Sequence, residues 1–264
     1  MSSLYYIHEE FGSDSTADTK APKDEFQDYD VVYVVDDLDN LTNDLSWLDQ
    51  FGKRIIEQEV ALDHRRLYLM LFEDGNRIDL TLCPKDHIQE WVDSEADFTV
   101  LNDPQGLFVP YAPTPKRYWT APASATDFDK SCNEFWWVST YVVKGLCRNE
   151  LFYAVTHLYE YCQQELLRLL SWQAAWQEPE PISVGKQFKY LKNYVTPDTM
   201  DQLASLLDFS SKEACWNSLI KTQAFFDVVA QDFAKMAQFT YHLQEAKKVT
   251  EYTNSLRLKD LQGK

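Results

Sequence analysis

The chain of 264 residues contains only 7 glycines and none of the glycine-rich patterns that hold phosphates in many nucleotide-binding proteins. Neither GxGxxG nor GxxxxGK followed by Ser or Thr occurs, and Gly185-Lys186 lacks the rest of a phosphate loop. The GxSxG pattern of a strained nucleophilic serine is missing as well. These absences argue against a P-loop enzyme, a glycine-cradled dinucleotide site and a serine nucleophile of that type.

Positive charge is also scarce, because 25 lysines and arginines face 42 acidic residues and leave a formal net charge of −17 at pH 7. A negative field repels nucleic acids and anionic membranes, and it attracts metal ions, polyamines and amino sugars. We therefore expect no nucleic-acid or membrane partner, whereas a small cationic ligand is compatible with the charge. Solubility alone would also account for this acidity.

Metal-binding and disulfide patterns are missing too. The 5 cysteines form no CxxC pair, and the 5 histidines form no HExxH or HxH pattern. We expect buried cysteines in a reducing compartment and structural histidines rather than metal ligands. No apolar run approaches the ~18 residues of a membrane helix, and the polar, acidic N-terminus differs from a secretory leader. These features predict a cytoplasmic protein.

Strand and helix patterns alternate in the first half of the chain. The β-branched and aromatic residues 31–35 predict a strand with acidic residues at both ends. Apolar residues at a spacing of three to four predict a helix over 41–58. Two further strands, 67–72 and 77–82, flank an Asp-Gly-Asn turn and predict a hairpin. Residues 86–94 predict a short helix.

The second half of the chain has a helical period throughout. Five prolines within residues 101–125 predict a linker. Beyond it, Thr196 followed by proline marks a helix start, and residues 212–252 predict one long helix or two. The fold class is therefore α+β, with a first domain at residues 1–122 and an all-α helical bundle at residues 123–264.

Two aspartates stand at the entry of the first strand. Asp28 and Asp30 are two residues apart, so they point to one face of that strand. Close carboxylates repel each other unless a cation lies between them, and hard oxygen ligands of this kind suit Mg²⁺. Such a pair is also common at solvated strand ends, so it is weak evidence alone.

A third aspartate strengthens this interpretation. Asp79 lies between Ile78 and Leu80 in a strand that reads as half-buried, where a lone acid is unusual. If the two strands are neighbours, Asp79 faces Asp28 and Asp30, and three carboxylates then form the cradle of a two-metal site. We therefore predict these three aspartates as catalytic and metal-binding residues.

Four segments in one order resemble the aminoglycoside 6-adenylyltransferases, also called streptomycin adenylyltransferases, of the nucleotidyltransferase superfamily. The similarity runs from about Asp24 to the C-terminus and includes DEFQDYDVVYVV, DGNRIDLTLCP, CNEFWWVSTYVVKGLCRNELFYA and SVGKQFKYLKNY. The resemblance implies an N-terminal nucleotidyltransferase domain with a mixed β-sheet, followed by a helical domain. It also implies transfer of AMP from ATP to an aminoglycoside hydroxyl, which inactivates the antibiotic.

The resemblance assigns roles to single residues. Asp28 and Asp30 would hold Mg²⁺, and Asp79 would be the third carboxylate and would accept or position the proton of the attacking hydroxyl. The reaction would be an in-line displacement at the α-phosphorus that uses two metals. The expected partners are ATP and a small cationic acceptor, bound by a monomer or a homodimer.

The helical half adds ligand-binding candidates. Glu134, Tyr141, Lys144 and Arg148 follow one another at intervals of seven, three and four residues and share roughly one helical face. Lys144 would meet the triphosphate, Glu134 an amino or guanidino group of the acceptor, and Tyr141 the acceptor as well. A solvated polar face is the alternative reading of the same spacing.

The opening of the chain departs from the family pattern. The family has Gly-Ser followed by Arg against the nucleotide phosphates, whereas Asp14 follows Gly12 and Ser13 here. We still assign Ser13 to the nucleotide. The short segment before Gly12 leads us to expect that the family's first helix and first sheet strand are truncated or altered. The alternatives are an impaired fold that binds nucleotide or a small cation without transfer, or an adenylyltransferase for another small acceptor.

Overall fold

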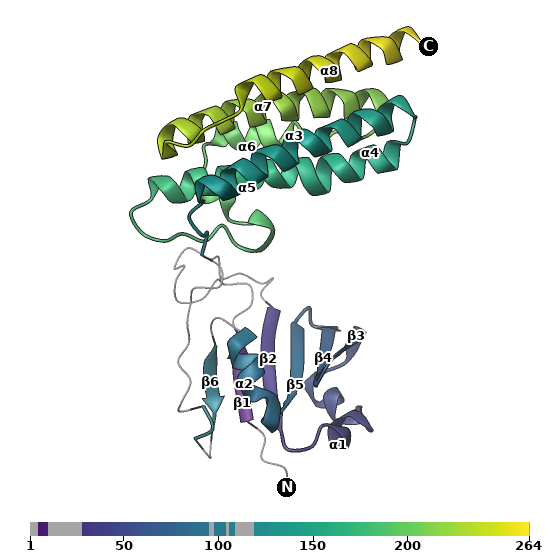
Figure 1. Cartoon of the computed structure of the whole chain (residues 1–264). Coiled ribbons are helices and arrows are strands. Elements are labelled where there is room, and N and C mark those ends of the chain that lie inside the picture. The colour runs from purple at the N-terminus through teal and green to yellow at the C-terminus, as the bar shows by residue number, and fades with distance from the viewer. Residues whose placement is uncertain (1–4, 10–27, 95–97, 104–105, 109–118, 264) are drawn as a thin grey trace. The chain divides into compact units, whose positions relative to one another are not determined.

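The computed structural model of this chain describes residues 5–9, 28–94, 98–103, 106–108 and 119–263 (Figure 1). The chain divides into two compact units, Met1–Trp119 and Thr120–Lys264. The first unit is built on a β-sheet and the second is helical, so the predicted α+β class is confirmed. Among the described helices, none combines the length and the apolarity needed to cross a membrane.

The first unit contains one mixed sheet with the strand order β3-β4-β5-β2-β1-β6. Its central pair, β2 and β5, is parallel, and the other neighbouring strands pair antiparallel. The strands are β1 (Tyr5–Glu9), β2 (Asp28–Val35), β3 (Arg54–Leu62), β4 (Arg65–Phe72), β5 (Arg77–Pro84) and β6 (Thr99–Asn102). The strand predicted at residues 31–35 is present as β2, and the predicted hairpin is present as β4 and β5.

The N-terminal segment contributes a strand that the sequence led us to consider lost. Strand β1 pairs antiparallel with both β2 and β6 inside the sheet. Since β1 lies between two partners, it covers the edge that β2 would otherwise expose to other chains. The expectation of a missing first sheet strand is therefore wrong.

Successive side chains of a strand point to opposite faces of the sheet, so β2 presents apolar residues to both faces. Helical segments cover each of these faces. Val32 and Val34 pack with Trp91 of helix α2 (Ile88–Ser94), which follows the 3₁₀ turn η2 (Lys85–His87). Tyr33 and Val35 pack on the other face with Leu48 of the 3₁₀ segment η1 (Ser46–Phe51). The predicted short helix at residues 86–94 is confirmed.

The helix predicted over residues 41–58 is wrong. This stretch forms the short helix α1 (Asp39–Thr42), then η1, and then strand β3. Gly52 has a φ of +133°, which a helix does not permit, and it separates η1 from β3. Beyond it, the β-branched Ile55 and Ile56 are exposed on the edge strand, so the apolar spacing did not report burial.

The second unit is a helical bundle. Ser124 and Asp127 form a reciprocal capping box at the start of α3. Thr196 caps α6 ahead of Pro197, which confirms the helix start that the sequence predicts. The elements are α3 (Ala125–Cys147), α4 (Leu151–His157), the π-helical turn η3 (Leu158–Cys162), α5 (Gln163–Gln177), the 3₁₀ turns η4 (Lys186–Phe188) and η5 (Leu191–Asn193), α6 (Pro197–Ala204), α7 (Lys212–Ala237) and α8 (Leu243–Gln262).

Aromatic packing joins the long helices. The rings of Phe135 in α3 and Phe226 in α7 stack with centroids 3.6 Å apart, and both side chains are fully buried. Gln223 of α7 donates from its buried amide to Ser139 of α3 and Thr253 of α8. A buried amide needs such partners, so this contact also sets the register of three helices.

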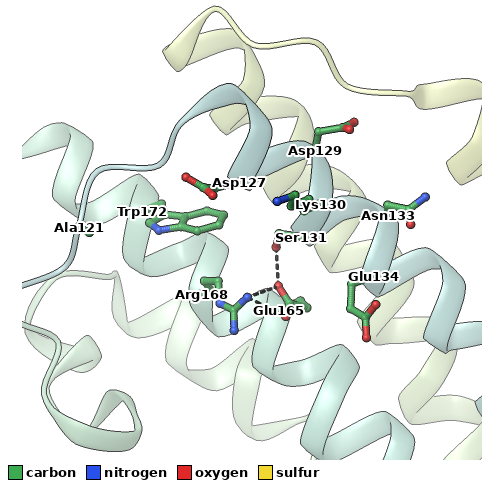
Figure 2. A pocket seen from close by; sticks show the side chains of 10 residues that line it. All are labelled: Ala121, Asp127, Asp129, Lys130, Ser131, Asn133, Glu134, Glu165, Arg168 and Trp172. Atoms are coloured by element: carbon green, nitrogen blue, oxygen red, sulfur yellow. Dashed lines mark hydrogen bonds and ion pairs between the residues drawn. The ribbon is translucent and has the colours of Figure 1, made fainter.

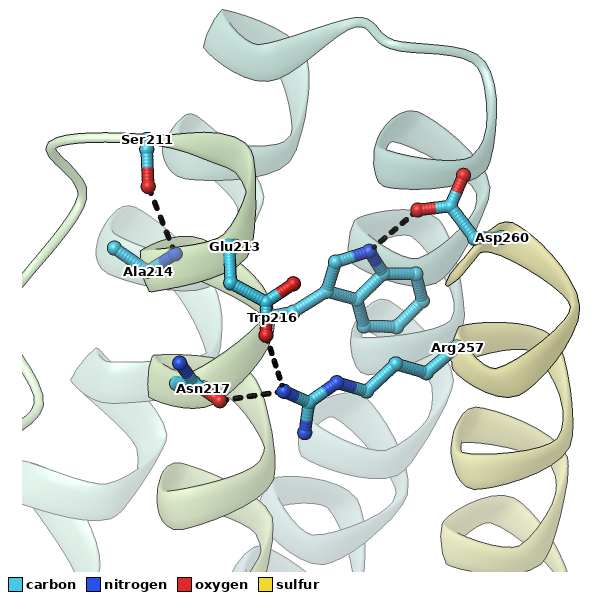
Figure 3. A network of polar contacts seen from close by, with 7 residues as sticks. All are labelled: Ser211, Glu213, Ala214, Trp216, Asn217, Arg257 and Asp260. Carbon is cyan, nitrogen blue, oxygen red and sulfur yellow. Dashed lines mark hydrogen bonds and ion pairs between the residues drawn. The ribbon is translucent and has the colours of Figure 1, made fainter. Parts of the chain in front are cut away.

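A polar network fastens α8 to the start of α7 (Figure 3). The carboxylate of Asp260 accepts a hydrogen bond from the indole of Trp216 at 3.1 Å. It also accepts one from Lys212 Nζ at 2.6 Å. One turn away, Arg257 pairs with Glu213 at 2.6 Å. The side chains of Lys212 and Asp260 are 18% and 13% exposed, so solvent screens their attraction only partly.

We predict that Asp260→Ala lowers the free energy of unfolding by about 1–3 kcal/mol, because it leaves a partly buried ammonium and an indole N–H without their acceptor. Urea denaturation of the full chain measures the change. Asp232→Ala, at an exposed position of α7, is the matched control and should stay within about 0.5 kcal/mol of the parent. Equal losses in both variants would contradict a special role of this network.

Candidate active site

Three aspartates lie together on the central strands of the sheet. In the parallel register of β2 and β5, Asp28 lies beside Arg77 and Asp30 lies beside Asp79. Since alternate residues share a face, Asp28, Asp30 and Asp79 point to the face on which α2 packs further along the strands. The prediction that the two strands are neighbours is confirmed.

Arg77 ties two of these carboxylates together. Its Nε and Nη2 atoms each lie 3.1 Å from an oxygen of Asp79, and its Nη1 lies 3.5 Å from Asp28 Oδ2. The pKa of Arg77 is raised, first by its hydrogen bonds to Asp79 and then by the negative charges of Asp79, Asp28 and Asp30. The field of three acids therefore converges on the position of one guanidinium group.

The aspartates are only partly solvated. The side chain of Asp79 is 15% exposed and that of Asp28 is 35% exposed, and Asp30 Oδ2 is shielded from solvent. Burial raises the pKa of Asp28, the charge of Asp79 raises it further, and Arg77 opposes both. Close, half-buried carboxylates outnumber the single arginine, so the site favours additional positive charge.

The donor set fits magnesium. Mg²⁺ prefers carboxylate oxygens, takes one or two of them from the protein and completes its shell with water and substrate phosphates. Asp28, Asp30 and Asp79 supply such oxygens on one face of adjacent strands. The residues present are therefore suited to hold divalent cations together with a phosphorylated substrate.

The nucleotide and acceptor candidates of the helical unit all lie on α3. Lys144 Nζ lies 5.1 Å from the ring centroid of Tyr141, within the range of a cation–π contact. The indole of Trp137 donates to the hydroxyl of Tyr141 at 2.9 Å, although Trp137 is 60% exposed. Tyr141 and Lys144 thus form one aromatic, cationic surface.

Glu134 belongs to a pocket of about 750 Å³ between α3 and α5 (Figure 2). Glu165 and Arg168 enter it from α5, and Trp172 adds an aromatic wall. These three residues had no role in the sequence-based prediction. The available signal was an acid at position 165 inside an apolar helical repeat, next to the fully buried Leu166.

Glu165 is the buried charge of this pocket. It is 7% exposed, accepts a hydrogen bond from Ser131 Oγ at 2.6 Å and pairs with Arg168 at 3.0 Å. Burial raises the pKa of Glu165, whereas Ser131 and Arg168 lower it and the charge of Glu134 raises it. Two carboxylates thus repel each other across one pocket, and an entering cation would relieve that repulsion.

Ser13 lies outside the described residues, as do Gly12 and Asp14. The described candidates thus fall into an acidic cluster on β2 and β5, and an aromatic and acidic face on α3.

The fold and the acidic cluster define the class of protein. A mixed sheet that presents three carboxylates on neighbouring strands, followed by a helical unit, is a nucleotidyltransferase arrangement. The chain matches the family model described as streptomycin adenylyltransferase over residues 11–256. The chain therefore belongs to the streptomycin adenylyltransferase family.

Individual relatives agree with this membership. The chain is 35% identical over 253 residues to an aminoglycoside 6-adenylyltransferase of Bacillus subtilis (strain 168). The aligned region covers 92% of this chain and 88% of the relative. The chain is 36% identical over 241 residues to the enzyme of the same description from Campylobacter jejuni, with 88% and 84% coverage. A crystal structure of an aminoglycoside 6-adenyltransferase from Bacillus subtilis aligns with a TM-score of 0.52 at 34% identity, over 88% of this chain and 89% of that one.

We predict that Arg77→Met raises the pKa of Asp28 further, because the charge of Arg77 lowers this pKa while burial and the charge of Asp79 raise it. A carboxyl ¹³C NMR titration of the full chain measures the midpoint. Arg66→Met is the control, since Arg66 pairs with Glu59 on other strands and should leave Asp28 unchanged. A midpoint that stays constant or falls in Arg77→Met would contradict the assigned balance of charges.

Proposed function

We propose that this chain transfers AMP from ATP to a hydroxyl group of an aminoglycoside such as streptomycin and thereby inactivates the antibiotic. The observation that carries the proposal is the register of β2 and β5, which brings Asp30 beside Asp79 and keeps Asp28 on the same face of the sheet. Membership of the streptomycin adenylyltransferase family supports the reaction class and the kind of acceptor.

The aspartates have distinct roles in this proposal. Asp79 accepts the proton of the acceptor hydroxyl while the oxygen of that hydroxyl forms a bond to the α-phosphorus of ATP. The bond from that phosphorus to the pyrophosphate oxygen breaks in line, and pyrophosphate leaves. Two Mg²⁺ ions, held by Asp28, Asp30 and Asp79, would neutralise the triphosphate charge. The paired contact with Arg77 holds the carboxylate of Asp79 in one orientation.

Lys144 and Ser13 are the proposed nucleotide contacts. The exposed ammonium group of Lys144, beside the ring of Tyr141, offers a positive charge to the phosphates. Ser13 would donate its hydroxyl to a phosphate oxygen.

The acceptor is proposed to bind with its cationic groups at the pocket of α3 and α5. Glu134 offers an exposed carboxylate, and Glu165 adds a buried negative charge behind it. Trp172 provides a flat apolar wall for a sugar ring. Tyr141 would extend the binding surface along α3. An ammonium or guanidinium group meets both carboxylates here, which favours amino sugars over neutral hydroxyl compounds.

We predict that Asp79→Asn lowers the rate of pyrophosphate release from ATP, Mg²⁺ and streptomycin by about 10²–10⁴-fold, because the proton acceptor is lost. Asp28→Asn and Asp30→Asn should instead raise the Mg²⁺ concentration that gives half the maximal rate. Asp93→Asn, exposed on α2, is the matched control with parent-like activity.

The parent chain decides between transfer and binding alone. Release of pyrophosphate that depends on streptomycin supports the transferase, and mass spectrometry should find the acceptor heavier by one AMP. Thermal stabilisation by ATP without any product, across a panel of amino sugars, would instead favour a fold that only binds its ligands.

We predict that two α3 variants each raise the KM of a different substrate. Glu134→Gln should raise the KM for streptomycin about tenfold and leave the KM for ATP unchanged, because a charge-assisted contact to the acceptor is lost. Lys144→Met should raise the KM for ATP instead. Glu178→Gln, exposed after α5, serves as the control. Equal effects of both variants on both substrates would refute the assignment of separate contacts.

A further inference from the structure

Two histidines and a glutamate meet at a place that the proposed reaction does not use. His64 lies in the turn between β3 and β4, His87 ends η2, and Glu90 lies in the first turn of α2. The antiparallel pairing of β4 with β5 brings the start of β4 beside the end of β5. Residues that are far apart in the sequence thereby share one corner of the sheet.

The side chains lie close enough for rotations about their own bonds to bring them onto one ion. One ligand atom from each of His64, His87 and Glu90 lies within 4.8 Å of the others. The Nδ1 atom of His87 is shielded from solvent and lies 3.3 Å from a carboxylate oxygen of Glu90. The two imidazole rings stack with centroids 3.8 Å apart and planes inclined by 9°.

The three side chains are of the types that bind zinc in proteins. Neutral imidazole nitrogen is the commonest protein ligand of zinc, and a carboxylate commonly completes such a set.

We propose that His64, His87 and Glu90 form a binding site for a borderline divalent cation of the Zn²⁺ class. Each residue supplies one ligand atom, and water fills the fourth tetrahedral position. A metal lies in the plane of each ring that binds it, at about 2.0–2.1 Å from nitrogen, so binding turns the stacked rings apart. His64 and Glu90 are exposed and have room for that rotation.

This site is distinct from the aspartate cluster. Asp79 lies near the start of β5 and His87 follows its end, and the five steps from Asp79 to Pro84 span about 17 Å. The ligands also differ in kind, since imidazole nitrogen suits zinc whereas three carboxylates suit Mg²⁺. A cation at the histidines would tie the β3–β4 turn to α2, so its expected effect is on the stability of the sheet unit.

Isothermal titration of the full chain with ZnCl₂, in excess Mg²⁺ and a non-chelating buffer, tests the site. We expect one equivalent of Zn²⁺ to bind and to raise the melting temperature. His64→Ala and His87→Ala should each weaken binding at least about tenfold. His242→Ala, exposed in the helical unit, and Asp28→Asn should bind Zn²⁺ as the parent does.

Co²⁺ gives a second readout, because a tetrahedral site with nitrogen ligands has intense visible absorption that should vanish in His64→Ala. If His87→Ala folds poorly, the exposed variants His64→Ala and Glu90→Gln keep the test valid. Binding that is unchanged in His64→Ala and Glu90→Gln, or that is lost in Asp28→Asn, would overturn the proposal. Neither result bears on pyrophosphate release, so the two proposals fail independently.

Discussion

The parallel pairing of β2 with β5 is the constraint on which the candidate active site depends. It places Asp30 directly beside Asp79 and brings Asp28 into reach of Arg77. Such a group of like charges is unfavourable by itself, and the remaining residues on both strands offset it through apolar burial on both faces of the sheet. The fold thus holds carboxylates at a spacing that attracts cations, which is the property that phosphoryl chemistry uses.

The helical unit repeats this principle with different chemistry. Glu165 is buried beside Ser131 and Arg168, and Glu134 adds a second carboxylate to the same pocket. In both units an arginine neutralises part of a crowded acidic site and leaves negative charge for a ligand. The net charge of −17 is therefore organised into local sites rather than spread only over the surface.

Most regular elements were predictable because their signals are local. Each signal lies within a few residues of the element that it specifies. Examples are the β-branched run of β2, the turn residues between β4 and β5, and the capping residue Thr196. The helix predicted over residues 41–58 failed because an apolar spacing on an edge strand resembles a helical period. The first strand was missed because its role depends on partners, β2 and β6, that lie elsewhere in the chain.

The sequence by itself determined the acidic balance, most of the regular elements and the three aspartates, since residue type and spacing carry that information. Only the tertiary structure decided which charges meet. Arg77 bridges Asp28 and Asp79 because two strands pair in one register, and His64 reaches His87 because a hairpin brings distant turns together. Spacing along one strand or helix cannot encode such contacts, because they depend on how separate elements pack against each other.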